Sequence, residues 1–195
     1  MHCNTACPAS TGCISQLDYS ACSSPKDWER IAGRSRLDST QSPVAIVEFS
    51  DYECPFCRQQ HLSLTPIVND PRLGGVAFRH LPLAIHKNAR GAALSVICAE
   101  EQGRFRELHD QLFRTDAWIA DSNWTREAVA AGVGDTIAFR TCRISEKAVA
   151  RLQEDMQLAR ELNVAGTPSF LYASGFYEGI LSDTTILRIA SRLPD

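Results

Sequence analysis

Residues 44–58 constrain the fold of this chain more than any other stretch of its sequence. Residues 44–49, Val-Ala-Ile-Val-Glu-Phe, form a short apolar run rich in β-branched side chains, which predicts a buried strand. The run Cys-Pro-Phe-Cys at 54–57 follows. Proline is tolerated in a first helical turn because its missing N–H would have no partner there. We therefore expect the two cysteines at a junction between this strand and a helix that ends near residue 68.

The rest of the chain predicts an α/β fold with helices inserted in its middle. Further strands are expected at 76–81, 169–172 and 176–178, and helices at 89–101, around 105–112, at 125–131, 135–142 and 146–162. Ser182 is expected to cap a last helix that packs through Ile186, Leu187, Ile189 and Ala190. The expected domains are an irregular, cysteine-containing extension at 1–42 and a folded domain at 43–195, with the helical insertion at about 88–162.

Charge and cysteine content limit the possible environment of the chain. The 195 residues suit one domain, and the net charge of −3 does not favour binding to nucleic acid. No apolar run is long enough to span a bilayer. Eight cysteines, an even number, favour an oxidising compartment. We therefore expect an extracytoplasmic protein, periplasmic or in the cell envelope. Because the first residues do not read as a signal peptide, we expect that its signal segment is absent from this chain.

The expected position of Cys54 predicts its chemistry. At a helix N-terminus, unpaired N–H groups and the helix dipole favour a thiolate, and such cysteines have pKa values of about 3.5–7.5. Cys54 is therefore the expected attacking thiol, and Cys57, one turn further along, the resolving thiol. A stabilised thiolate also makes the disulfide more oxidising. Phe56 adds no charge between the cysteines, which favours a milder oxidant, and the adjacent Glu53 is expected to be solvated.

A zinc site is the main alternative for the cysteine pair. Zinc knuckles need a second pair of ligands at fixed spacing, and the sequence holds no second Cys-x-x-Cys. His61 lies on the same predicted helix, but no partner histidine follows at ligand spacing. We therefore expect neither a metal nor another cofactor, and a binding module that uses the cysteines as ligands remains the alternative from a different functional class.

Four motifs in order resemble the DsbA-like branch of the thioredoxin superfamily, exported thiol–disulfide oxidoreductases with a helical insertion. They are VEFSDYECPFC, FRHLPLAIHKNA, ALSVICAEEQGRF and VAGTPSF. The resemblance covers roughly residues 43–193. It implies a thioredoxin fold, a dithiol–disulfide cycle and no cofactor beyond the cysteines.

The resemblance also assigns a loop that faces the cysteine pair. It implies that Pro168 follows a cis peptide bond and that backbone groups of Thr167 lie beside the sulfurs. An extended substrate could pair with that backbone, next to Pro55 and Phe56. The sequence alone leaves a trans proline that opens a strand equally possible.

An acidic residue at the position of Glu48 is common in thioredoxin-like proteins. Burial beneath the cysteine pair would raise its pKa and let it accept a proton from Cys57. The alternative is a carboxylate at a strand end that reaches solvent.

The resemblance implies a structural disulfide between Cys98 and Cys142, while two buried free thiols remain the alternative. Cys3, Cys7, Cys13 and Cys22 allow three pairings. Two disulfides in the extension are expected, with a metal site that includes His2, or an electron relay to the active cysteines, left open. We expect structural roles for His80, His86 and His109, with His80 satisfied by hydrogen bonds, whereas His61 could tune Cys57.

Together these observations predict an enzyme that introduces or exchanges disulfides in exported proteins. Its expected partners are reduced or misoxidised substrates and a membrane quinone-linked reoxidase or reductase. A reductase or isomerase of the same fold is the alternative within this class.

Overall fold

A mixed sheet of four strands lies at the centre of the part of the chain that the computed structural model describes, residues 25–38, 42–68, 70, 72–172 and 175–191. The strand order is β2-β1-β3-β4. Strand β1 (Val44–Ser50) runs parallel to β2 (Gly75–His80) and antiparallel to β3 (Ser169–Tyr172), and β4 (Gly175–Glu178) pairs antiparallel with β3. The predicted strands are confirmed.

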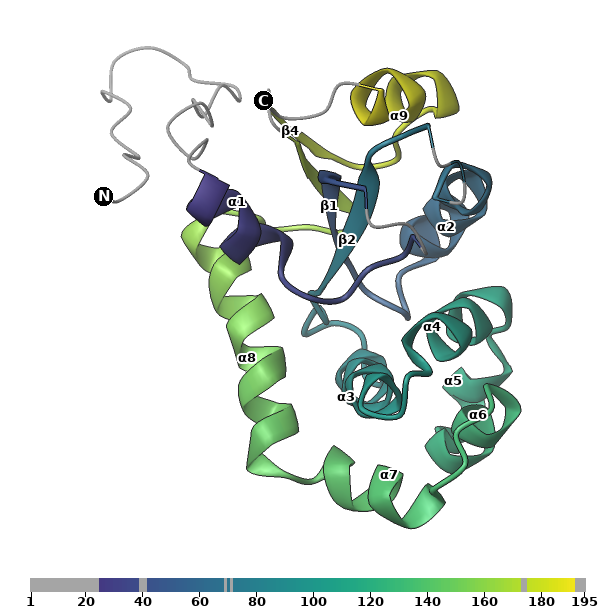
Figure 1. Cartoon of the computed structure of the whole chain (residues 1–195). Helices are drawn as coiled ribbons and strands as arrows, with labels where there is room; N and C mark the ends of the chain where they lie inside the picture. Colours follow the sequence, from purple (N-terminus) through teal and green to yellow (C-terminus); the bar gives the residue numbers. More distant parts are fainter. Residues whose placement is uncertain (1–24, 39–41, 69, 71, 173–174, 192–195) are drawn as a thin grey trace.

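Helices cover both faces of the sheet (Figure 1). Helices α2 (Pro55–Ile67) and α9 (Asp183–Ala190) lie on one face, and α1 (Pro25–Ala32) and α8 (Glu146–Glu161) on the other. Because successive strand side chains point to opposite faces, β1 contributes to two cores. The core on the α2 face includes Ile46 and Cys57, and the core on the α8 face includes Val47 and Phe49. The buried strand on which the α/β prediction rested is therefore confirmed.

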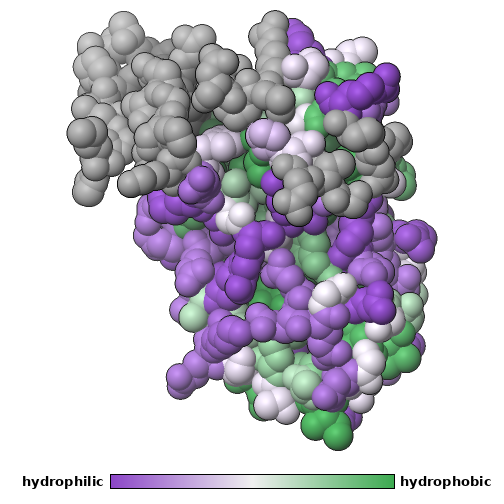
Figure 2. All heavy atoms as spheres, in the orientation of Figure 1, coloured by the Kyte–Doolittle hydropathy of each residue, from purple (hydrophilic) through white to green (hydrophobic). Residues whose placement is uncertain are grey.

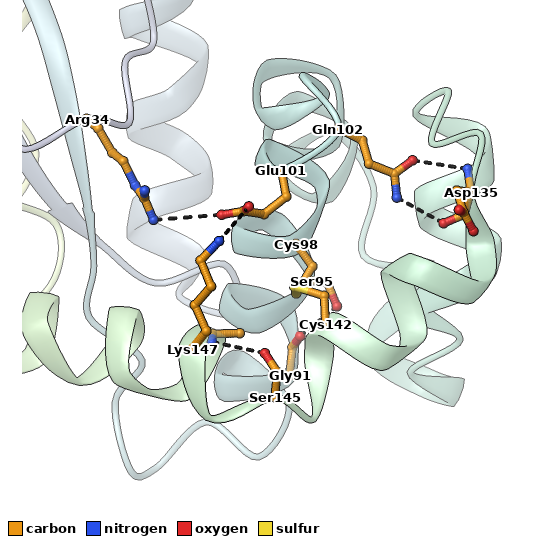
Figure 3. Close-up of a disulfide and its surroundings, with 11 residues drawn as sticks. Arg34, Gly91, Ser95, Cys98, Glu101, Gln102, Asp135, Cys142, Ser145 and Lys147 are labelled. Atoms are coloured by element: carbon orange, nitrogen blue, oxygen red, sulfur yellow. Dashed lines mark hydrogen bonds and ion pairs between the residues drawn. A yellow bond between two sulfur atoms is a disulfide. The ribbon is translucent and has the colours of Figure 1, made fainter.

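Five helices lie in the expected insertion between β2 and α8, among the residues that the structure describes. They are α3 (Ala89–Glu100), α4 (Phe105–Arg114), α5 (Ala117–Asp121), α6 (Trp124–Ala130) and α7 (Thr136–Arg143). The short α5 was not predicted. A disulfide between Cys98 on α3 and Cys142 on α7, with an S–S distance of 2.03 Å, joins the two helices (Figure 3). Beside it, Gln102 and Asp135 form two hydrogen bonds, of 2.9 and 3.0 Å.

The expectation that the chain is irregular up to residue 42 was wrong, because α1 and the segment after it pack on the sheet. Ile31 is buried, and the Trp28 indole donates a 2.7 Å hydrogen bond to the main chain at the start of β1. The backbone N–H of Leu37 donates to the carbonyl of Val76 on β2 at 2.9 Å. This segment therefore covers an edge of the sheet that would otherwise expose unpaired backbone groups. The four cysteines at 3–22 lie outside the described residues.

The last helix begins as predicted, with the Ser182 hydroxyl accepting a hydrogen bond from the backbone N–H of Thr185. Ile186, Ile189 and Ala190 are buried, but Leu187 is exposed, so its predicted packing was wrong. An eight-residue helix that covers a sheet buries only one stripe, and Leu187 lies outside that stripe.

The outer surface that Figure 2 shows is largely hydrophilic, with hydrophobic groups towards its lower end, where α6 and α7 lie. Val129 on α6 and Ile137 on α7 are among the exposed apolar residues. No helix in the described ranges is both long enough and apolar enough to cross a membrane.

Candidate active site

The two cysteines lie where the sequence predicts them, at the junction of β1 and α2. After β1 ends, a short turn closes with a 3.2 Å hydrogen bond from the N–H of Cys54 to the carbonyl of Asp51. Cys54 is the N-cap residue of α2, and Pro55 occupies the first helical turn. The Cys54 carbonyl accepts the helical hydrogen bond from the N–H of Arg58 at 3.1 Å. Cys54 Sγ therefore lies among the free N–H groups of a helix N-terminus.

Both cysteines are present as free thiols, and they differ in accessibility. The exposed fraction is 4% for Cys54 and 0% for Cys57, while Phe56 between them is 59% exposed. Cys54 Sγ lies 3.4 Å from the carbonyl oxygen of Thr167, and the peptide bond from Thr167 to Pro168 is cis. The loop before β3 thus lies against the sulfur of Cys54, which is the cysteine of this pair that keeps some exposed surface.

The environment drives the pKa values of the two thiols in opposite directions. The hydrogen bond from Cys57 is the largest cause that lowers the pKa of Cys54 to about 5, and it outweighs the opposing effect of burial. The backbone N–H groups of Cys57 and Phe56 add to this lowering. Burial raises the pKa of Cys57 far above its usual value, and the hydrogen bond with Cys54 adds to the rise. At neutral pH, Cys54 is a thiolate and Cys57 a thiol.

Glu48 is buried in the middle of β1, paired with Phe78 on β2 and Phe170 on β3. Strand alternation places its side chain on the same face as Ile46, which belongs to the core that contains Cys57. Burial raises the pKa of Glu48 to about 7, although the nearby Ser50 side chain opposes the rise in part. A carboxyl group of this kind can hold or release a proton at neutral pH. The alternative of a carboxylate that reaches solvent is wrong.

Partly buried polar contacts link the turn before Cys54 to the segment after β2 and to the start of the helical insertion. The carboxylate of Asp51 accepts a hydrogen bond of 2.8 Å from the backbone N–H of Leu83 and lies 2.8 Å from Nδ1 of His86. The carboxylate of Glu53 accepts a 2.6 Å hydrogen bond from the backbone N–H of Asn88. The expectation of a solvated Glu53 was therefore wrong, because its side chain turns towards the start of α3.

The histidines near the cysteines are governed by burial. Neither ring nitrogen of His80 has a hydrogen-bond partner among the described residues, so the expected hydrogen bonding of His80 was wrong. Burial lowers its pKa to about 4, which keeps the ring neutral at pH 7. His61, which the sequence leaves as a candidate to tune Cys57, stacks on Phe113 with ring centroids 5.1 Å apart and lies 3.6 Å from Asp110.

Comparison with known proteins places the site in a family. The sequence profile of a thioredoxin family matches residues 36–189, which include the cysteine pair and the loop before β3. This chain belongs to the thioredoxin family. The profile begins within the segment that pairs with β2, so the family match and the described fold agree on that segment.

Curated relatives of this thioredoxin-family chain carry two kinds of name. Over 131 residues it is 32% identical to Na(+)/H(+) antiporter NhaA 3 of Salinispora tropica, a match that covers 67% of this chain and 20% of the antiporter. The chain therefore spans about a fifth of the length of that relative. It is 26% identical over 154 residues to Disulfide bond formation protein D of Bacillus subtilis, covering 71% of this chain and 67% of that protein.

A solved structure shows the same fold. A thioredoxin-like oxidoreductase from Silicibacter pomeroyi DSS-3 superposes with a TM-score of 0.73 at 24% identity, covering 83% of this chain and 94% of that one. The predicted thioredoxin fold with inserted helices is therefore confirmed. Sequence reasoning found the two cysteines, Glu48 and the Thr167–Pro168 loop, but it missed Asp51. The one available signal for Asp51 was an acidic residue directly after a buried strand.

Proposed function

We propose that this thioredoxin-family chain is a thiol–disulfide oxidoreductase that introduces disulfides into exported proteins. The observation that carries this proposal is the placement of two free cysteines at the start of α2, with Cys54 Sγ 3.4 Å from the carbonyl oxygen of Thr167 and Cys57 fully buried. These surroundings lower the pKa of Cys54 to about 5 and strongly raise that of Cys57. A thiolate is the nucleophile in disulfide exchange, and a thiol of low pKa is the better leaving group. The pair therefore stabilises its reduced form, which makes its disulfide a ready acceptor of electrons.

Disulfide donation takes two exchange steps. A substrate thiolate attacks Cys54 Sγ of the oxidised pair, which forms a mixed disulfide, breaks the bond between the cysteines and releases Cys57 as a thiolate that takes up a proton. A second substrate thiolate then attacks the substrate sulfur of the mixed disulfide. Cys54 leaves as a stabilised thiolate, and the substrate is oxidised by two electrons.

Glu48 supplies the proton that the first step needs. With a pKa of about 7 it is partly protonated at neutral pH, and the emerging Cys57 thiolate is a far stronger base. In the reverse direction Glu48 accepts the proton of Cys57 as that thiol attacks the mixed disulfide. This role agrees with its position on the face of the sheet that packs against α2.

The substrate chain lies against Thr167, Pro168 and the exposed start of α2. Thr167 offers backbone groups for strand-like pairing, while Pro55 and Phe56 are exposed beside the sulfur. Substrates would be reduced or misoxidised proteins in an extracytoplasmic compartment. Reoxidation of the dithiol requires an electron acceptor, for which we propose a quinone-linked membrane protein. The resemblance to the DsbA-like branch and the eight cysteines support this assignment.

The reduction potential of the Cys54–Cys57 pair tests this function. Because the thiolate is stabilised, equilibration with glutathione is expected to give a potential between about −200 and −120 mV. The pair is also expected to oxidise a reduced model substrate such as ribonuclease. A potential near that of thioredoxin, about −270 mV, would instead identify a reductase.

Replacement of Glu48 by Gln is expected to slow exchange and stabilise the fold. Since the folded pKa is raised from 4.5 to about 7, the contribution of this carboxyl to stability is present below pH 4.5 and is lost as pH rises through 7. The free energy of unfolding of Glu48→Gln, taken relative to that of the wild type, should therefore be about 3 kcal/mol higher at pH 8 than at pH 4.5. Urea unfolding at both pH values measures this gain.

Glu154→Gln, at an exposed position of α8, is the matched control and should show no such pH-dependent gain. Stopped-flow measurement of the reaction between the oxidised enzyme and a thiol substrate reports the proton step. Equal rates in Glu48→Gln and wild type between pH 6 and 8 would remove Glu48 from the mechanism.

A further inference from the structure

Three side chains with metal-binding atoms meet where α2 packs against α4, one helical turn after Cys57. They are His61 on α2 and His109 and Asp110 on α4. One ligand atom from each lies within 4.8 Å of the other two, and Nε2 of His61 is 3.6 Å from Oδ1 of Asp110. Ligand atoms around a tetrahedral zinc ion with bonds of about 2.1 Å are separated by about 3.4 Å. The cluster therefore needs side-chain shifts of less than about 1 Å to hold an ion.

His109 is the member of the cluster that has a buried nitrogen without a hydrogen-bond partner among the described residues. It is 1% exposed, and its Nε2 has no hydrogen-bond partner in the described part of the chain. A buried polar atom without a partner costs free energy that a ligand could recover. Its other nitrogen, Nδ1, lies 3.1 Å from the hydroxyl of Tyr52. When Nδ1 donates its proton to that hydroxyl, Nε2 presents a lone pair, which is the tautomer that metal-bound histidines adopt.

The other two members of the cluster, His61 and Asp110, also have the orientation and solvent access that metal ligands need. Both oxygens of Asp110 accept hydrogen bonds from Nε of Arg106, at 3.2 and 3.0 Å, which fixes the orientation of the carboxylate. Hydrogen bonds of this kind to a ligating carboxylate are typical around metal ions. Side-chain exposures of 12% for His61 and 20% for Asp110 leave a route from solvent.

The types of ligand decide the kind of ion. Calcium and magnesium need several oxygen ligands, which this cluster lacks. Two imidazoles and one carboxylate suit zinc and its neighbours among the divalent transition metals.

We propose that His61, His109 and Asp110 form a binding site for a divalent transition metal, with zinc the best match and water in the fourth position. The site joins the helix that carries both cysteines to the helical insertion. Since the ion binds only the folded arrangement, occupancy raises the melting temperature of the protein. This proposal is independent of the redox function.

Cobalt(II) is the probe, because its visible absorption reports tetrahedral coordination. The full chain is used with the Cys54–Cys57 pair oxidised, all remaining free thiols alkylated and His2 replaced by Ala, so that ligands elsewhere are removed. One equivalent of cobalt is expected to bind and to be displaced by zinc, and zinc should raise the melting temperature.

Variants at the partly exposed ligands separate binding from folding. His61→Ala and Asp110→Asn should each weaken cobalt binding at least tenfold without loss of the circular dichroism spectrum. His86→Ala, which changes another half-buried histidine beside an aspartate, should bind cobalt like the parent protein. Absence of the cobalt bands in the parent, or equal binding in His61→Ala and Asp110→Asn, would overturn the proposal.

Discussion

Cys54→Ala is expected to abolish disulfide exchange, whereas Cys57→Ala is expected to trap a mixed disulfide with the substrate. Cys54 is the residue whose sulfur lies at the loop that faces the pair, while Cys57 has no exposed surface. Without Cys54 the redox pair presents no accessible sulfur to a substrate, so the rate should fall to that of the uncatalysed reaction. Without Cys57, the Cys54 thiolate can still attack a disulfide of an oxidised substrate, which forms a mixed disulfide and releases one substrate thiolate, but no resolving thiol remains. Oxidation of reduced ribonuclease measures the first outcome, and non-reducing electrophoresis of Cys57→Ala mixed with scrambled, oxidised ribonuclease measures the second.

Alkylation gives the same assignment without a substrate. In the reduced protein, the rate at which iodoacetamide modifies Cys54 should follow a titration near pH 5, well below the usual value for a cysteine. In Cys57→Ala the midpoint should shift upward, because the hydrogen bond from Cys57 is the largest cause of the lowered pKa. An unchanged midpoint in that variant, or modification of Cys57 in place of Cys54, would refute the assigned roles.

The part of the site that sequence reasoning could predict is the part fixed by local structure. A strand, a proline-led helix and two cysteines one turn apart determine the position of Cys54 at a helix N-terminus. The inward side chain of Glu48 follows from the apolar run around it. The loop of Thr167 and Pro168 is 113 residues from Cys54 in the sequence, and only the resemblance to a known family assigned it.

What the sequence could not show depends on contacts between distant segments. Glu53 and Asp51 read as ordinary acidic residues of a turn, yet their partners lie more than 30 residues away, in the segment after β2 and at the start of the insertion. The same holds for α1, whose packing requires the sheet to exist first. His80 was expected to be hydrogen-bonded because most buried polar groups are, and its ring is instead enclosed by aromatic neighbours such as Phe78.

These long-range contacts make the active-site turn dependent on the helical insertion. The backbone N–H of Asn88 donates a hydrogen bond to the carboxylate of Glu53. Helix α3 starts at the next residue and carries Cys98. Unfolding of the start of α3 should therefore release the turn before Cys54, whereas a change that lowers stability but leaves α3 folded should not. The disulfide ties α3 covalently to α7.

Replacement of both Cys98 and Cys142 by Ala is expected to destabilise the protein by about 4 kcal/mol, because the disulfide closes a chain segment with a sequence separation of 44 residues. Loss of the crosslink increases the conformational entropy of the unfolded chain, while the small alanines leave the core between α3 and α7 intact. Urea unfolding of the oxidised proteins, without reductant, measures the difference. The single variants Cys98→Ala and Cys142→Ala serve as controls, and their free energy of unfolding should fall by a similar amount.

The same variant distinguishes a structural disulfide from a redox-active one. If the bond only constrains the fold, the double variant should oxidise ribonuclease at the wild-type rate at 25 °C, since α3 stays folded at that temperature and the contact of Asn88 with Glu53 remains. Its melting temperature should fall while the potential of the Cys54–Cys57 pair stays constant. A changed potential with unchanged stability would contradict the structural role, and it would mean that electrons pass between the two pairs.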